Sequence, residues 1–465
     1  MMRHITWQSC EFSTSPEMRL GWLIVSLAAL GLMQLWLASH SADHSVNASA
    51  GPRTLLHRRK STASAATTAT ASTAATAATA TASTAATAGS ATVAPPLPPD
   101  TPPPPPPSMR ARELRALPSV QACRAALPPQ LRNPVFELGR KGRVRDPAVR
   151  LINGTHELYY THYEGDPKRM FSGSALEGYT VRTVRTSDWT SFSPPETVTP
   201  HGFVSPDAPV RWKGTTLLAY QAYPDKALGG PRSGLFLSHR VSAKADKPAH
   251  WSMPAPFLEE ALDLPWNTQH RAIDPTLFVG PDGKLHCFFI GSTSLPQPAS
   301  AKAQRPRRAN LLGHAVTDDT KLKRWRVVTT EKPLLGVSER APDGVENVAV
   351  FQRHDGSYQM IYSEGLVAQH LAYAVSSDLY TWHDRGQLKL AGAGPVPAGA
   401  VDVRVQAWMA GRYGAPFVWR DSDGCFRMTL MGEYEVVTHR SAVGLLGSAD
   451  GEQWELLAEK RAYNI

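Results

Sequence analysis

The stretch RDPAVRLINGTHELYYTHY, residues Arg145 to Tyr163, has the pattern of a β-hairpin with an acid at its entrance. Asn153 and Gly154 separate two runs that are rich in apolar, aromatic and β-branched residues. Asn-Gly supplies the positive φ values that a tight hairpin turn requires, and the flanking runs favour strands. Asp146 therefore puts a carboxylate at the start of a predicted strand, and similar hairpins elsewhere in the chain indicate what it does there.

The hairpin pattern recurs along the folded part of the chain. The matching segments are 205–223 (SPDAPVRWKGTTLLAYQAY), 272–292 (AIDPTLFVGPDGKLHCFFIGS), 344–365 (GVENVAVFQRHDGSYQMIYSEG) and 413–433 (YGAPFVWRDSDGCFRMTLMGE). Each unit then closes with a polar turn and a tryptophan, which are in order Trp189, Trp251, Trp325, Trp382 and Trp454. Five units of several short strands predict an all-β, five-bladed β-propeller, because a small sheet buries both faces only when neighbouring blades stack against it. The alternative is a β-sandwich with similar hairpins, and in either fold the tryptophans are expected in the core or at blade edges.

Acids occupy the entrance of four of the five predicted inner strands. They are Asp146, Asp207, Asp274 and Glu346, and in the fifth unit the small residues Gly414, Ala415 and Pro416 stand in that register. In a propeller the first strand of each blade lines the central axis, so the four acids are expected to converge on one axial pocket. Carboxylates that lie so close cannot all ionise freely, and a separation of their pKa values is what a general acid and a general base require. Local turn capping by the aspartates is the structural alternative.

At these residues the domain resembles the five-bladed propeller glycoside hydrolases of family 43 and their relatives, which include arabinanases, arabinofuranosidases, xylosidases and galactanases. The segment RDPAV is similar to the first-blade motif of the family, AIDPTLFVGPDGKLHCFF to the third, and GVENVAVFQRHDGSYQMIYSEG to the fourth. The resemblance implies Asp146 as general base, Asp274 as the residue that orients substrate and tunes the acid, and Glu346 as general acid. It also implies an inverting mechanism, in which the base activates a water molecule on the opposite face of the sugar.

Three further residues are expected to contact substrate: Asp207, in a segment similar to the second-blade motif, and Arg412 and Tyr413 at the fifth blade. The sequence departs from the family pattern at Asn347 and Val348, where a small residue and proline usually follow the acid. It also has Arg412, Tyr413 and Gly414 where Arg-His-Gly is frequent.

Other acids compete for a catalytic role. Glu339 is a rival acid in the loop before Glu346, whereas Glu364 and Glu433 follow their hairpin turns and are expected to lie away from the strand entrance. His270, Arg271 and Arg404 are candidates for the rim.

The first part of the chain differs in composition from the propeller. Residues 1–19 form a short tail, and residues 20–38 carry no charge and span about 28 Å as a helix, which predicts a signal-anchor that crosses the membrane, with a cleaved signal as the alternative. Residues 39–116 are rich in Ala, Thr, Ser and Pro and are expected to be a disordered stalk, before a propeller domain at 117–465. A single-pass type II membrane protein of the Golgi or cell surface, or else a secreted protein, is the predicted location.

The net charge limits the classes of binding partner, and the cysteine content limits the number of disulfides. The net charge is +9, but in a secretory setting an acidic polysaccharide or a membrane surface fits this balance better than nucleic acid, and an ordinary solvated surface fits it better than either. Of the four cysteines, Cys10 precedes the predicted membrane helix, which leaves at most one intramolecular disulfide and one free thiol. No cofactor is required; an axial calcium ion is compatible with the pocket but is not predicted, and the oligomeric state stays open.

The expected activity is hydrolysis of pentose- or galactose-containing glycans. A carbohydrate-binding propeller without catalysis, and a glycosyl transferase or phosphorylase with a similar pocket, are the alternatives.

Overall fold

The computed structural model describes residues 122–457 apart from 124–126, 140–141, 166–177, 223–233, 243–249, 297–306, 367–368, 392–406 and 435–439. The predicted tail, membrane helix and stalk lie outside these residues. Within the described part, no helix is both long and apolar enough to cross a membrane.

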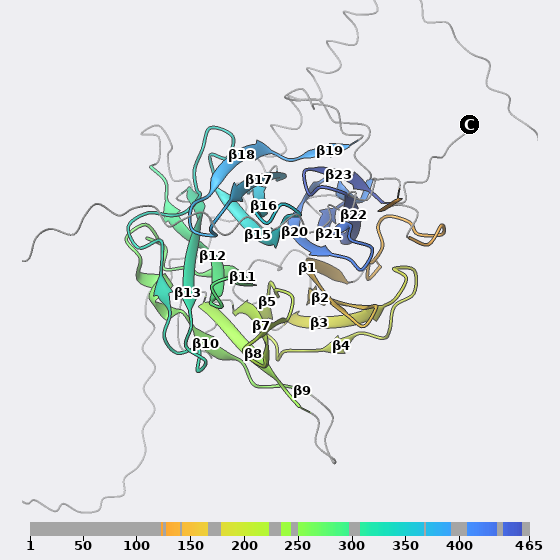
Figure 1. Ribbon diagram of the computed structural model, residues 1–465, viewed down its shortest axis with the longest axis horizontal. Helices are drawn as coiled ribbons and strands as arrows, with labels where there is room; N and C mark the ends of the chain where they lie inside the picture. The colour runs from red at the N-terminus through yellow and green to blue at the C-terminus, as the bar shows by residue number, and fades with distance from the viewer. Residues whose placement is uncertain are drawn as a thin grey trace, which may run out of the picture. The chain divides into compact units, whose positions relative to one another are not determined.

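Five sheets succeed one another around a common axis (Figure 1), and their strands pair antiparallel apart from the parallel pair β19 (Lys389–Ala391) and β23 (Gln453–Leu456), which confirms the predicted five-bladed propeller. Blade 1 contains β1 (Arg143–Ile152), β2 (Thr155–Tyr163), β3 (Tyr179–Thr186) and β4 (Glu196–Thr197). Blade 2 contains β5 (Phe203–Val204), β6 (Val210–Trp212), β7 (Thr215–Ala222), β8 (Gly234–Val241), β9 (His250–Trp251) and β10 (Ala255–Phe257). Blade 3 contains β11 (Ile273–Val279), β12 (Leu285–Ser294), β13 (Arg308–Thr317) and β14 (Arg326–Val327). Blade 4 contains β15 (Val345–Gln352), β16 (Tyr358–Glu364), β17 (His370–Ser376) and β18 (His383–Gln387). Blade 5 contains β19 (Lys389–Ala391), β20 (Arg412–Arg420), β21 (Phe426–Glu433), β22 (Ser441–Ser448) and β23 (Gln453–Leu456). Two 3₁₀ helices, η4 (Glu259–Asp263) and η5 (Ala407–Met409), precede β11 and β20.

The hairpin turn of blade 1 has the conformation that its sequence predicts. Asn153 and Gly154 have φ values of 48° and 79°, and Ile152 pairs with Thr155 across the turn. Positive φ at both central residues is the requirement of the two-residue hairpin turn whose twist matches the strands. The turn fixes the register of β1 against β2, and with it the position of Asp146 at the far end of the hairpin.

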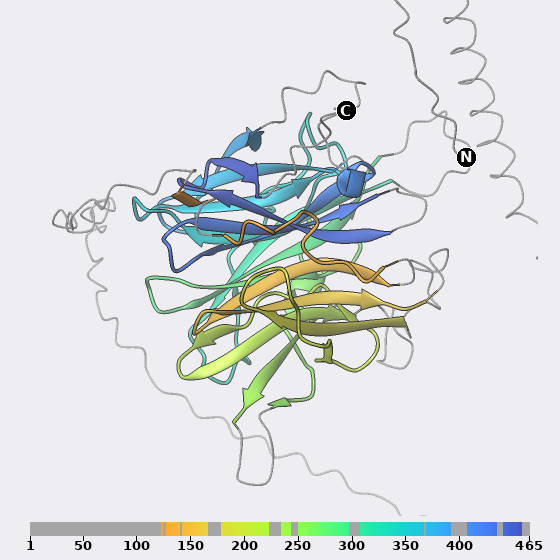
Figure 2. The ribbon, with the colours of Figure 1, turned by 90° about the vertical axis from the view of Figure 1, so that its right-hand side faces the viewer.

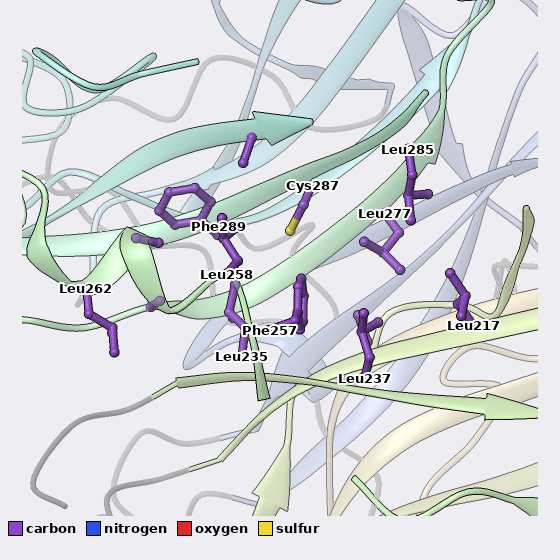
Figure 3. Close-up of a cluster of buried hydrophobic side chains, with 14 of the residues drawn as sticks. Leu217, Leu235, Leu237, Phe257, Leu258, Leu262, Leu277, Leu285, Cys287 and Phe289 are labelled. Carbon is purple, nitrogen blue, oxygen red and sulfur yellow. The ribbon is translucent and has the colours of Figure 1, made fainter. Parts of the chain in front are cut away.

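The hydrophobic core is divided among the interfaces between neighbouring blades. One cluster lies between blades 2 and 3 and includes Leu217, Leu237, Leu277 and Cys287, and Figure 3 shows Cys287 among the leucines. Separate clusters fill the interfaces between blades 3 and 4, blades 4 and 5, blades 5 and 1, and blades 1 and 2. Burial between blades, rather than within one sheet, therefore holds the ring together.

The tryptophan of each blade packs against the preceding blade, so the predicted core role of these residues is confirmed. The ring pairs across the interfaces are Trp251 with Tyr159 of blade 1, Trp325 with Phe257 of blade 2, Trp382 with Phe288 of blade 3, and Trp189 with Trp419 of blade 5. Trp454 is fully buried in the cluster between blades 4 and 5. The repeated tryptophan is thus a contact that each blade makes with its neighbour.

The ring closes where the segment before β1 meets blade 5. Val443 of β22 exchanges backbone hydrogen bonds with Phe136, and a disulfide joins Cys123 to Cys425. Figures 1 and 2 show blue blade 5 beside orange β1. Cys287 is the buried free thiol, so the expected cysteine arrangement is confirmed for the described residues.

Candidate active site

The inner strand of every blade contains a residue with left-handed backbone at the axis. These residues, with φ between 44° and 50°, are Asp146, Ser205, Asp274, Asn347 and Ala415. The strand pairing slips at four of these positions, and in blade 2 the strand breaks there into β5 and β6. Asp and Asn tolerate this conformation better than Ser or Ala, and outliers of this kind concentrate at functional sites.

The positions of these left-handed residues show that the predicted matching register of the four acids is wrong. Only Asp146 and Asp274 occupy equivalent positions, because Asp207 follows Ser205 by two residues. Glu346 immediately precedes Asn347. The four acids therefore approach the axis at three different levels of their strands.

Side chains on the second strands hold the strained residues of the following blade. Thr161 Oγ1 accepts the backbone N–H of Ser205 at 2.7 Å, and Gln221 Oε1 accepts that of Asp274 at 2.6 Å. Ser363 Oγ accepts the backbone N–H of Ala415 at 2.9 Å. These bonds link blade 1 to 2, 2 to 3 and 4 to 5, and they satisfy amides that the bulges remove from strand pairing.

Asp146 is fixed by two hydroxyl groups. Its Oδ2 accepts hydrogen bonds from Thr161 Oγ1 at 2.8 Å and from Ser205 Oγ at 3.2 Å. The carboxylate is thereby oriented from both sides of the interface between blades 1 and 2, and it lines the axial cavity.

Asp274 is buried next to the other two candidate catalytic acids. Burial raises the pKa of Asp274 to about 8, and repulsion from Glu346 and Asp146 contributes to the rise. Arg271 and a hydrogen bond from Ser205 oppose it. Asp274 consequently retains a proton at neutral pH, although it lies within electrostatic reach of two other carboxyl groups.

Glu346 is held by an amide on each oxygen. Asn310 Nδ2 donates to Oε1 at 2.5 Å, and Gln369 Nε2 donates to Oε2 at 2.9 Å. Gly414 is required beside this arrangement, because a Cβ there would come within 2.9 Å of Gln369 Oε1. The small residue of blade 5 thus leaves room for the group that holds the acid of blade 4.

A cavity on the axis is lined by the bulges of all five blades, and it has about 330 Å³ of space that opens to solvent. Its lining includes Asp146, Asp207 and Asp274, together with Asn347 and Ala415.

Asp207 braces blade 2 against blade 3. Its Oδ2 accepts the backbone N–H of Leu277 at 2.6 Å, and the side chain is buried. Burial raises the pKa of Asp207 to about 7, although backbone hydrogen bonds from Leu277 and Ala208 lower it. Asp207 therefore combines a place in the cavity wall with a structural hydrogen bond.

The two predicted contacts from blade 5 have different surroundings. Arg412 Nη2 donates to Glu433 Oε1 at 2.7 Å. Tyr413 packs against the hydrophobic cluster between blades 4 and 5. Of the two, Arg412 is the side chain that forms an ion pair at the strand entrance.

The expected position of Glu364 and Glu433 is wrong. Antiparallel pairing brings the end of each second strand back to the start of the first, so Glu364 pairs with Val345 and Glu433 with Arg412. His370 and Arg340 lie at 2.7 Å and 3.2 Å from the Glu364 carboxylate. Burial would raise the pKa of Glu364, but these hydrogen bonds bring it below its ordinary value.

Arg271, which was a candidate for the rim, contacts Asn310, the residue that holds Glu346. Its Nη1 lies 3.3 Å from Asn310 Oδ1 and 3.4 Å from Ser292 Oγ. Asn310 and Gln369 were missed because they come from β13 and from the loop before β17, outside the repeated hairpins. Glu339 is exposed, and Arg404 lies outside the described residues. Among the described residues, no group of three or more His, Cys, Asp or Glu side chains is arranged to hold a metal ion.

No protein-family model and no curated protein matches the sequence. Solved structures do match. A family-43 enzyme from Xanthomonas citri in complex with xylose is 16% identical with a TM-score of 0.44, and the alignment covers 71% of this chain and 96% of that one. A thermostable family-43 glycoside hydrolase is 13% identical with a TM-score of 0.46, and the alignment covers 71% of this chain and 98% of that one. A family-43 β-xylosidase/α-arabinofuranosidase from a compost metagenome, in complex with xylotriose, is 15% identical with a TM-score of 0.42. The alignment covers 67% of this chain and 93% of that one. The chain has a structural match to family-43 glycoside hydrolases at low sequence identity.

Proposed function

We propose that the chain is a glycoside hydrolase that cleaves pentose- or galactose-containing glycans at its axial cavity. The observation that carries the proposal is that Asp146 and Asp274 line one axial cavity, while Glu346 lies within electrostatic reach of Asp274. One of the three retains a proton at neutral pH because its neighbours and its burial oppose ionisation. Acid/base cleavage of a glycosidic bond requires carboxyl groups whose environments give them different pKa values.

The roles follow from charge development in the reaction. Glu346 is the general acid that protonates the departing glycosidic oxygen, and Asp146 is the general base that activates water on the opposite face of the sugar. Asp274 lies within electrostatic reach of both and orients substrate while it modulates their protonation. Asp207 and Arg412 complete the proposed contacts with the sugar, and Tyr413 supports the wall of blade 5.

The setting of the proposed enzyme is the secretory pathway, with the propeller tethered to a membrane by residues 20–38. The disulfide between Cys123 and Cys425 supports this location, because such bonds persist in oxidising compartments.

The substrate is tested by incubating the full-length chain with arabinan, xylan, galactan and nitrophenyl glycosides and measuring released sugar. Release from a pentose or galactose substrate is expected, and proton NMR of the first product should show the inverted anomer. Retention of configuration would contradict the inverting mechanism. Binding of a glycan by a folded chain that releases no sugar would favour a carbohydrate-binding propeller.

A further inference from the structure

A buried series of polar side chains runs through blade 3 to Glu346. It begins in the loop before β11 and contains Asn267, Ser292 and Asn310, all of them without solvent exposure. Buried polar groups that are joined in this way fix one another's orientation, since each bond removes a choice from its neighbour.

The amide of Asn310 has one orientation that satisfies its neighbours. Arg271 has no acceptor, so its contact with Asn310 Oδ1 at 3.3 Å requires the oxygen on that side. Ser292 Oγ donates to the same oxygen at 2.7 Å. The NH₂ group of Asn310 is therefore the side that faces Glu346 Oε1.

The next residue back in the series is fixed as well. Asn267 Nδ2 donates to the carbonyl oxygens of Ala261 and Arg271, each at 2.7 Å. Its Oδ1 accepts the backbone N–H of Ser292 at 2.8 Å. If the nitrogen and oxygen of the Asn267 amide exchanged places, the amide oxygen would face two carbonyl oxygens and both hydrogen bonds would be lost. The Asn267 amide therefore has a single orientation.

The backbone couples Asn310 to the strand that carries Glu346. Asn310 N donates to Asp343 O at 3.0 Å, and Asn310 forms a bridge with Gly344 at the entrance of β15. Asn310 and Glu346 thus keep a fixed separation although they belong to different blades.

We infer that Asn310 is a positioning residue, which holds the carboxyl group of Glu346 so that its reactive proton lies away from the amide of Asn310. Gln369 holds the other oxygen through its Nε2. The NH₂ groups that face Glu346 donate and cannot accept, so a proton on Glu346 has to lie on the lone pairs that they leave, away from Asn310 Nδ2 and Gln369 Nε2. The inference rests on the proposed function, because it concerns the direction in which Glu346 delivers its proton.

The test is Asn310→Asp in the full-length chain, followed by the pH dependence of kcat/KM. The change keeps the shape and the oxygen that accepts from Arg271 and Ser292, but it turns the donor toward Glu346 into a carboxylate oxygen. An added carboxylate disfavours ionisation of its neighbour, so the alkaline limb is expected to move up by about one pH unit or more, with a lower maximum.

Asn133→Asp is the matched control. Asn133 also donates through its amide to backbone carbonyls, including Leu445 O at 3.0 Å, but at the outer strands of blade 5. This variant is expected to leave both limbs in place. A profile of Asn310→Asp that falls in height with unmoved limbs would overturn the positioning role.

A second measurement separates this inference from the proposed function. Thermal unfolding of Asn310→Ala, Glu346→Ala and the double variant forms a cycle that needs no substrate. The double variant is expected to lose less stability than the sum of the single variants, and an additive result would overturn the contact. A coupled cycle in a wild-type chain that hydrolyses nothing would refute the proposed function while the hold of Asn310 on Glu346 stands.

Discussion

At the scale of single residues, the site depends on backbone strain as much as on charge. Asp146 and Asp274 adopt left-handed φ values of 49° and 48° on otherwise extended strands. Aspartate bears this conformation at lower cost than most side chains, and the bulge turns its carboxyl group toward the axis. Ser205 and Ala415 take the same backbone without an acid, so the conformation belongs to the inner strand and the chemistry to the side chain placed on it.

The pH dependence of stability tests the protonation of Asp274. Its pKa is about 8 in the folded protein against an ordinary value of 3.8, so the folded state holds a proton that the unfolded state loses as pH rises. The associated stability is complete below the unfolded pKa and is lost as pH rises through 8, at about 1.4 kcal/mol per pH unit. Asp274→Asn should therefore flatten the decline of the unfolding temperature between about pH 4 and 8.

A residual slope is expected in that variant, because Asp207, with a pKa of about 7, acts in the same direction. Thermal unfolding monitored by circular dichroism at a series of pH values measures both slopes. An equal slope in wild type and Asp274→Asn would show that Asp274 is ionised in the folded state.

The sequence predicts which acids reach the axis better than it predicts their level on the strand. In blades 2 to 5 the left-handed residue stands at one constant distance ahead of the glycine of the hairpin turn, and in blade 1 it is one residue nearer to Gly154. The glycines of blades 2 to 5 are in order Gly214, Gly283, Gly356 and Gly424. Asp207 and Glu346 miss this distance, which was a visible signal of their different levels. The positions of Glu364 and Glu433 were mispredicted because antiparallel pairing, rather than distance along the chain, decides what lies beside the strand entrance.

At the scale of elements, side-chain hydrogen bonds connect the second strands of blades 1, 2 and 4 to the inner strand of the next blade. Gln221 on β7 is fully buried and accepts the backbone N–H of Asp274 on β11. Ile290 occupies the corresponding position of blade 3, where Thr276 Oγ1 instead donates to the carbonyl of Val348 at 2.5 Å. Hydrogen bonds of this kind depend on three-dimensional pairing and have no signature in a hairpin motif.

Gln221→Leu tests this connection. The change leaves the amide of Asp274 without its acceptor, and a buried unsatisfied donor costs about 1–3 kcal/mol. The free energy of unfolding in urea should fall by that amount. An unchanged free energy of unfolding would contradict the role of the acceptor.

The repeated tryptophans provide the apolar counterpart. Trp382 contacts Phe288 of the preceding blade at 5.9 Å between ring centroids, and its indole N–H bonds to Leu379 O. Trp382→Ala should lower the free energy of unfolding by about 3–5 kcal/mol, as expected for a large aromatic side chain at a packed interface. Trp382→Phe is the control that retains a ring, and a change below about 1 kcal/mol in the alanine variant would refute the contact's importance.

At the scale of the whole molecule, the closed ring brings residues that are distant in sequence to one axis. The repeats were sufficient to predict five blades, because the hairpin and the closing tryptophan both have a structural role in every unit. The closure was not predictable in the same way, since the pairing of Phe136 with Val443 joins segments without a shared motif.

Closure by the disulfide leads to a redox prediction. The bond between Cys123 and Cys425 spans a sequence separation of 302 residues, and disulfides typically stabilise by about 2–4 kcal/mol. A reducing agent, or the double change Cys123→Ser and Cys425→Ser, should lower the unfolding temperature. Cys287→Ser is the control for the free thiol, and a stability unaffected by reduction would show that the ring closes without the disulfide.

Sugar release from wild type, Glu346→Gln and Glu339→Gln, measured side by side, tests whether the axial carboxyl groups break a glycosidic bond. Glu339 is an exposed acid in the loop before Glu346 and serves as the matched control. Loss of a general acid typically lowers turnover by about 10²–10⁴-fold. This loss is expected for Glu346→Gln with an unchanged circular dichroism spectrum, and near wild-type release is expected for Glu339→Gln. Equal release by wild type and Glu346→Gln would contradict the role of Glu346 as general acid.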